Sequence, residues 1–237
     1  MQVKIALMSD SHCSHDQIIV PECDILIHAG DFSYRGSEVE SRDFLQWLSE
    51  QTQAKARVYV CGNHEYKWDA NKWPGKSKPG WLTQLFHEYP SLYYLEHESI
   101  NLYGLNIFGS PYTPEFFPEY WGFNRSRGEE LKGEWAKIPD NTDIIVSHGP
   151  AKGFLDWTDE APHGSRYPGG HVGCADLFNR LYHLKQLKLV VTGHLHGNTG
   201  MIDIPMEGSR IVKYCNAAVV DNQYKVTHQP QIITLEV

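Results

Sequence analysis

The sequence predicts an α/β protein in which a mixed β-sheet, or two packed sheets, is flanked by helices. Short apolar runs typical of buried strands alternate with a helical pattern in the first half of the chain, and strand patterns dominate the second half. Five of the apolar runs end at side chains that bind metals or transfer protons. The 237 residues, 41% of them hydrophobic, suit a single domain over residues 1–237.

In the first half, strands are predicted where apolar runs of five or six residues occur, at Val3–Met8, Asp24–His28 and Ala56–Cys61. The loop between the first two runs has room for at most a turn or two of helix. Ser37 and Glu40 fit a capping box, and apolar residues follow at helical spacing, so Ser37–Gln51 is predicted to be a helix. Residues 66–80 suit an ordered surface loop, followed by a short helix over Trp81–Glu88.

In the second half, the segment from Ser91 to Gly109 contains short β-rich runs and is predicted to be an antiparallel section. Helical patterns cover Glu129–Lys137 and Gly173–Lys185. Further strands are predicted at Asp143–Val146, Lys188–Thr192, Ile202–Ile204, Ile211–Asn216 and Ile232–Val237.

Composition disfavours several classes of partner. A formal charge of −8 and a pI near 5.9 are unfavourable for nucleic acid and for membrane surfaces, which reward a basic face. No apolar run approaches the ~18 residues that a membrane span needs, and no basic region or cleavage site precedes the first strand. The five cysteines are odd in number, without a Cys-x-x-Cys motif, which indicates free thiols and a cytoplasmic protein.

Side chains of metal-ligand type follow five of the predicted strands: Asp10, His12, Asp31, Asn63, His148, His194 and His196. The carboxyl ends of strands in an open α/β sheet are where ligands bind, so these residues can form one site. Seven ligands are too many for one ion with open positions, but they divide into two sets of four if one carboxylate bridges two ions. Oxygen and nitrogen ligands without thiolate favour manganese, with iron, zinc or cobalt as alternatives, over magnesium or calcium.

These residues lie in short motifs that resemble the five signature blocks of the calcineurin-like metallophosphoesterases: Asp10-Ser-His12, Gly30-Asp31, Gly62-Asn63-His64-Glu65, His148 and Gly193-His194-Leu195-His196. The short first crossover and two further motifs, Ser147–Pro150 and His171–Cys174, resemble the subgroup called metallophosphoesterase domain-containing proteins. The resemblance implies a four-layer αββα sandwich of two mixed β-sheets flanked by helices. It also implies phosphoester hydrolysis at a centre of two divalent metal ions.

By the same resemblance, one ion is held by Asp10, His12, Asp31 and His196, and the other by Asp31, Asn63, His148 and His194. Asp31 bridges the two ions. A hydroxide between the ions is expected to attack phosphorus in line, and His64 to protonate the leaving oxygen, with Asp31 and Asn63 as the other catalytic residues. Glu65 stands where many family members have Asp, which leaves open whether it orients His64.

Two loops rich in aromatic residues and arginine, 111–127 and 152–172, are expected to choose the substrate. Their rings can stack on a nucleobase, or they can anchor the loops to the body of the protein. The predicted function is a phosphodiesterase that hydrolyses a small nucleotide, such as a cyclic nucleotide. Alternatives are a phosphoprotein phosphatase, which shares every metal ligand, and a catalytically weak scaffold that binds metal or nucleotide.

Overall fold

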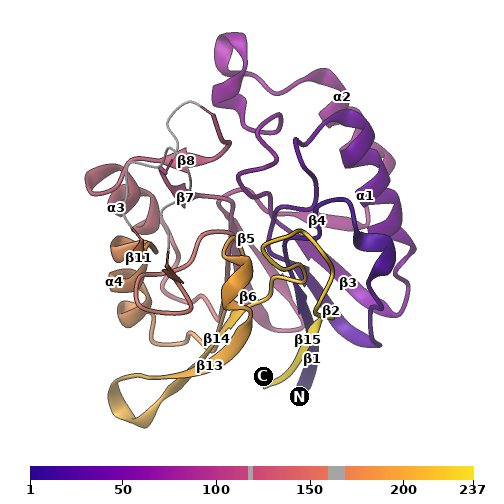
Figure 1. Ribbon diagram of the computed structural model, residues 1–237. Coiled ribbons are helices and arrows are strands. Elements are labelled where there is room, and N and C mark those ends of the chain that lie inside the picture. Colours follow the sequence, from indigo (N-terminus) through magenta and orange to yellow (C-terminus); the bar gives the residue numbers. More distant parts are fainter. Residues whose placement is uncertain (117–119, 160–168) are drawn as a thin grey trace.

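The structure is a computed structural model that describes residues 1–116, 120–159 and 169–237. One sheet contains β1 (Gln2–Met8), β2 (Cys23–His28), β3 (Ala54–Tyr59), β4 (Leu92–Tyr94) and β15 (Gln231–Glu236), in the order β15-β1-β2-β3-β4. All pairs are parallel except β15 with β1, which places the chain termini side by side (Figure 1).

The other sheet contains β5 (Glu98–Leu102), β6 (Leu105–Ser110), β9 (Ile144–Ser147), β12 (Leu189–Thr192), β13 (Gly200–Pro205) and β14 (Ile211–Asn216). Its order is β13-β14-β12-β9-β6-β5, parallel in the middle and antiparallel at both edges. Two further strand pairs, each two residues long, join β7 (Thr113–Pro114) to β8 (Asn124–Arg125) and β10 (Trp157–Thr158) to β11 (Gly170–His171).

Successive strand residues point to opposite faces of a sheet, and here both faces are buried. In β1, Ile5 and Leu7 belong to the core between the two sheets, whereas Ala6 and Met8 face the core under the helices. Helices α1 (Glu38–Glu50) and α2 (Gly80–Glu88) cover the first sheet. Helices α3 (Glu129–Trp135) and α4 (Ala175–His183) cover the second (Figure 1). The predicted four-layer αββα sandwich is therefore confirmed.

The predicted elements lie where the sequence placed them, within a few residues at each end. The capping box is confirmed: the Ser37 hydroxyl accepts the Glu40 N–H, and the Glu40 carboxylate accepts the Ser37 N–H at 2.9 Å. The first crossover contains only the 3₁₀ turn His15–Gln17, as expected. The five cysteines are free thiols. No helix within the described ranges is long and apolar enough to cross a membrane.

The prediction of an antiparallel section from Ser91 to Gly109 was partly wrong. Only β5 and β6 form an antiparallel pair, whereas β4 pairs parallel with β3 in the other sheet. The reason is that α2 lies between β3 and β4 and returns the chain across the sheet, so β4 enters in the same direction as β3. This section of chain therefore passes from one sheet to the other.

Candidate metal centre

The carboxyl ends of β1, β2 and β3 in the first sheet meet those of β9 and β12 in the second, so the edge that carries the site belongs to two sheets and not to one. All seven predicted ligands gather there. Five of them are buried, Asp10, His12, Asp31, Asn63 and His148, and the other two, His194 and His196, are partly exposed.

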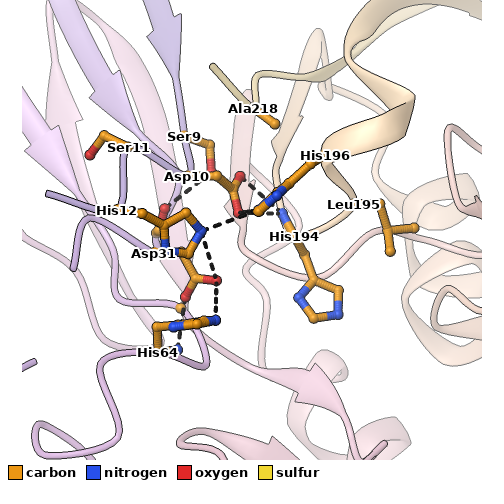
Figure 2. Close-up of polar contacts among 12 residues, drawn as sticks. Ser9, Asp10, Ser11, His12, Asp31, His64, His194, Leu195, His196 and Ala218 are labelled. Atoms are coloured by element: carbon orange, nitrogen blue, oxygen red, sulfur yellow. Dashed lines mark hydrogen bonds and ion pairs between the residues drawn. The ribbon is translucent and has the colours of Figure 1, made fainter. Parts of the chain in front are cut away.

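One ligand group contains Asp10, His12 and His196 (Figure 2). The Nε2 atom of His196 lies 3.2 Å from Nε2 of His12 and 3.4 Å from Oδ1 of Asp10. Each imidazole donates its Nδ1–H to a backbone carbonyl at 3.2 Å, His12 to Ser33 and His196 to Asp221, so Nε2 is the nitrogen of each ring that faces the ligand group. Atoms bound to one ion at ~2.1 Å lie about 3.0–3.4 Å apart, so this spacing fits a shared cation.

A second group contains Asp31, His148 and His194, with Asn63 beside it. Nε2 of His148 lies 3.2 Å from Oδ2 of Asp31 and 3.1 Å from Oδ1 of Asn63. Its Nδ1–H is donated to the Ala29 carbonyl at 2.8 Å, which again directs Nε2 inward. These separations also match those of ligands on one ion.

Asp31 lies between the two groups. Its Oδ2 is 3.2 Å from Nε2 of His148 in one group and 4.0 Å from Nε2 of His12 in the other. Asp31 also belongs to a further possible set, with His12 and His64. Figure 2 shows Asp31 facing the rings of His12 and His64. Its position suits the bridging role expected of one carboxylate.

The protonation states of the carboxylates suit cation binding. Burial opposes ionisation of Asp10, but its hydrogen bond to His196 and the charge of that ring lower the pKa of Asp10 to about 2. For Asp31, burial is likewise outweighed by His148 and His64, so its pKa lies well below the usual value. Both side chains are anionic at neutral pH, as ligands of a divalent ion must be.

The imidazole ligands differ in the direction in which the site shifts their pKa values. Burial lowers the pKa of His12 to about 4 and that of His194 to about 3, so both rings are neutral and able to coordinate. Burial also disfavours the charged form of His148, but the adjacent Asp31 carboxylate raises its pKa to about 9. A cation at this position must therefore displace a proton from His148.

Four of the seven predicted ligands have left-handed backbone conformations: φ is 55° at Asp10, 39° at His12, 55° at Asp31 and 71° at His194. Such conformations cost ~1–2 kcal/mol each for residues with a Cβ, and they concentrate at functional sites. Backbone bonds hold two of them in place: the Asp10 N–H donates to the Gly30 carbonyl at 2.9 Å, and the His12 N–H to the Asp31 carbonyl at 3.1 Å.

Two motif glycines allow the close packing of this site. A Cβ at Gly62 would lie 2.2 Å from Oδ1 of Asp31, and a Cβ at Gly193 would lie 2.1 Å from Oδ2 of Asp10. Any larger side chain at either position would therefore displace a candidate ligand.

His64 lies beside Asp31, but its ring is oriented by a hydrogen bond to the Tyr34 carbonyl. Its backbone N–H donates to Oδ1 of Asp31 at 2.8 Å, and its Nδ1–H donates to the Tyr34 carbonyl at 3.0 Å. Nε2 is 4.0 Å from Oδ2 of Asp31. The His64 ring is therefore oriented by the Tyr34 carbonyl and not by Glu65. The Glu65 carboxylate accepts hydrogen bonds from backbone N–H groups and a hydroxyl group at the strand ends.

The predicted substrate loops are only partly in reach of the site. The ring of Trp121 lies 4.4 Å from that of His64, and Phe116 lies 5.1 Å from His194. Trp157 is about half exposed and makes a ring contact with His171. Three residues of the second loop, His163, Arg166 and Tyr167, lie outside the described residues.

Arg125, in the first of the two loops, has its guanidinium 4.2 Å above the ring of Tyr112, a packing role. Sequence reasoning missed Tyr34 and Tyr224, whose rings lie 5.7 and 4.8 Å from that of His12. Neither stands in a motif or in an aromatic-rich loop, so no local signal marked them.

Comparisons with known proteins agree with this geometry. The model of the calcineurin-like phosphoesterase family matches residues 3–198, which include all seven predicted ligands. The human metallophosphoesterase domain-containing protein 1 is 32% identical, covering 98% of this chain and 71% of the human protein, and its mouse counterpart matches equally well.

Two solved structures share the fold. The phosphopantetheinyl hydrolase of Mycobacterium tuberculosis superposes with a TM-score of 0.55 at 16% identity, over 93% of this chain and 90% of that chain. A putative 5′-nucleotidase from Staphylococcus aureus gives a TM-score of 0.54 at 14% identity, over 100% of this chain and 51% of that chain.

Proposed function

Because the chain belongs to the calcineurin-like phosphoesterase family, we propose that it is a dinuclear metal-dependent phosphodiesterase that hydrolyses a small nucleotide ester. One observation carries the proposal. The imidazole nitrogens and carboxylate oxygens of two groups converge at ligand spacing, and Asp31 lies between them. The single-domain organisation, manganese as the native metal and a cytoplasmic location belong to the same proposal.

In this proposal, Asp10, His12, Asp31 and His196 hold one ion, and Asp31, Asn63, His148 and His194 hold the other. When bound, two such ions supply positive charge to the phosphoryl oxygens and lower the pKa of a bound water. The protein side chains supply the anionic charge of two carboxylates and fix the direction of each ring through its Nδ1–H bond.

His64 is proposed to give a proton to the leaving oxygen. Since its Nδ1–H is committed to the Tyr34 carbonyl, Nε2 is the ring atom left to face a substrate. Its side chain is 12% exposed, which is enough for contact with solvent or ligand. Proton transfer by such a group typically contributes ~10² to 10⁴-fold to the rate.

The test is a screen of phosphoesters with the manganese-loaded protein, together with elemental analysis of the metal content. We expect two ions per chain and faster turnover of diesters, such as bis-p-nitrophenyl phosphate and cyclic nucleotides, than of phosphopeptides. Faster turnover of phosphopeptides would instead identify a phosphoprotein phosphatase. Two bound ions without turnover of any ester would identify a binding scaffold, and a chain that takes up no metal would refute the proposal outright.

A further inference from the structure

Tyr34 and Tyr224 lie side by side at the first ligand group. The ring of Tyr224 is 4.8 Å from that of His12 and 5.2 Å from that of His196, edge-on to both. The ring of Tyr34 stacks on His12 at 5.7 Å, and the two tyrosine rings are 5.9 Å apart with a 47° angle between their planes. Two residues separated by most of the chain thus form one aromatic corner.

Both rings are still accessible, with exposed fractions of 43% for Tyr34 and 40% for Tyr224. The other half-exposed rings in the described part of the chain, such as Tyr93, Tyr103 and Tyr182, are not in ring contact with a predicted metal ligand. An accessible aromatic face beside a polar centre offers stacking area together with a hydroxyl group.

The two rings are fixed by the same hydrogen bonds that orient the site. The Tyr34 carbonyl accepts from Nδ1 of His64, and the Asp221 carbonyl accepts both from Nδ1 of His196 and from the Tyr224 N–H. The Asp221 carboxylate closes that turn by accepting the Lys225 N–H at 3.0 Å. Within it, Tyr224 has a left-handed backbone, with φ of 61°.

A backbone conformation that disfavours side chains is retained where the surrounding structure enforces it, and such positions concentrate at binding sites. Here it holds the Tyr224 ring against His12 and His196. The aromatic corner is therefore built into the site by the backbone around it.

A second cluster of rings lies beside His64. Trp121 lies 4.4 Å from the ring of His64, and the rings of Phe116 and Tyr120 pack on Trp121 at 6.3 and 4.8 Å. These rings support the proposed proton donor and one another. Tyr120 is more exposed than Tyr34 or Tyr224, at 66%, but its ring contact is with Trp121. Tyr34 and Tyr224 are therefore the accessible rings that lie directly against the first ligand group.

We propose that Tyr34 and Tyr224 form a subsite for the planar aromatic group of the substrate, such as a nucleobase. This inference rests on the proposed function, because the subsite needs a phosphoryl group held at the adjacent ligands. A phosphoester at that position lies next to the corner, since the rings contact two of the three ligands of that group. Stacking on an aromatic side chain tolerates any base, so the subsite selects planar groups without choosing among bases.

The experiment compares ligand binding by calorimetry on the manganese-loaded protein, with AMP, phenyl phosphate, ribose 5-phosphate and inorganic phosphate as probes. The wild type should bind AMP and phenyl phosphate more tightly than the two probes without an aromatic ring. Loss of one stacked base costs ~1–3 kcal/mol, so Tyr224→Leu or Tyr34→Leu should weaken AMP binding about 5- to 140-fold. Binding of inorganic phosphate should change by less than about twofold, and Tyr224→Phe should behave like the wild type.

Tyr182→Leu is the matched control, because Tyr182 is also 40% exposed but lies on α4, away from the ligands. Equal weakening of AMP and inorganic phosphate would show that the tyrosines only support the metal ligands, and would overturn the inference. So would equal affinity of the wild type for AMP and ribose 5-phosphate, a comparison that needs no variant. A wild type that prefers AMP without hydrolysing any ester would sink the proposed function and leave the subsite standing.

Discussion

Glu65 accepts a hydrogen bond from the backbone N–H of Asp31, with 2.9 Å between the donor nitrogen and Oε2. The same oxygen accepts the Gly62 N–H at 2.7 Å, while Oε1 accepts the N–H and the hydroxyl of Ser33 at 2.9 and 2.7 Å. One buried carboxylate therefore ties the loop after β2, which carries Asp31, to the loop after β3, which carries Asn63. It positions two candidate ligands and belongs to none of the candidate ligand groups itself.

Replacing Glu65 with Gln should weaken metal binding. An amide offers only one accepting oxygen, and its NH₂ group would face N–H groups that now have an acceptor. Loss of a group that orients ligands typically costs ~10- to 100-fold in metal affinity. Manganese titration with an indicator measures this, with the exposed Glu129→Gln as control. Unchanged affinity would mean that the two loops hold their positions without Glu65.

The stability of the metal-free protein should fall as the pH rises from about 6.5 to 9. Below 6.5, the lowered pKa values of His12 and His194 act in the opposite direction, because the unfolded chain binds protons there that the folded rings do not. Burial and the charge of Asp31 raise the pKa of Glu65 from 4.5 to about 8, so the folded state keeps a proton that the unfolded chain releases. The raised pKa of His148, from 6.5 to about 9, acts in the same direction: its contribution is full below 6.5 and is lost as the pH rises through 9. Urea unfolding at pH 7, 8 and 9 measures the slope.

Glu65→Gln should flatten this dependence, and an equally steep slope in the variant would assign it to other groups. With manganese bound, the stability should instead rise with pH, because the ion displaces the His148 proton and binds more tightly as the pH rises.

Replacing Asp31 with Ala should remove both ions, because the carboxylate lies between the two ligand groups. Asp31→Asn keeps the shape but loses the charge, and should reduce occupancy of both sites to a lesser degree. Elemental analysis of the dialysed protein gives the count. Two ions and near-normal turnover in Asp31→Ala would contradict a shared carboxylate.

Replacing His64 with Ala should leave the metal content unchanged and slow turnover. The loss should reach ~10² to 10⁴-fold for alkyl esters and shrink for nitrophenyl esters, whose leaving groups need no proton. His87→Ala, an exposed change on α2, is the control. An equal loss on both kinds of ester would assign His64 to phosphate binding or positioning instead.

Gly62→Ala should lower metal occupancy, because its Cβ would fall 2.2 Å from Oδ1 of Asp31. Gly133→Ala is the matched control, since a Cβ there meets nothing within 4 Å and lies inside α3. That change should stabilise the protein by ~0.5–1 kcal/mol, as alanine usually does in a helix. Thermal unfolding and metal analysis of both variants test the contrast. Full occupancy in Gly62→Ala would show that the site tolerates a displaced Asp31.

Much of the site could be predicted from the sequence because its signals are local. An apolar run that ends at Asp10 or His148 marks a strand and a ligand together, and Ser37 with Glu40 marks the start of a helix. The number of ligands indicated two ions before any contact was known. The αββα architecture was predicted from the family resemblance. The two large sheets, packed on each other and covered by helices on their outer faces, confirm that prediction.

Tertiary structure alone decided which residues face one another. Nε2 of His12 lies 3.2 Å from Nε2 of His196, a residue 184 positions away, and Tyr34 meets Tyr224 across a similar span. β4 pairs parallel with β3 because α2 returns the chain across the sheet. Glu65 accepts hydrogen bonds from Asp31 and Ser33, whereas the Tyr34 carbonyl accepts the hydrogen bond from His64. Residue type and spacing are properties of a short segment, whereas these contacts depend on how two sheets pack through a shared core, which no short segment contains.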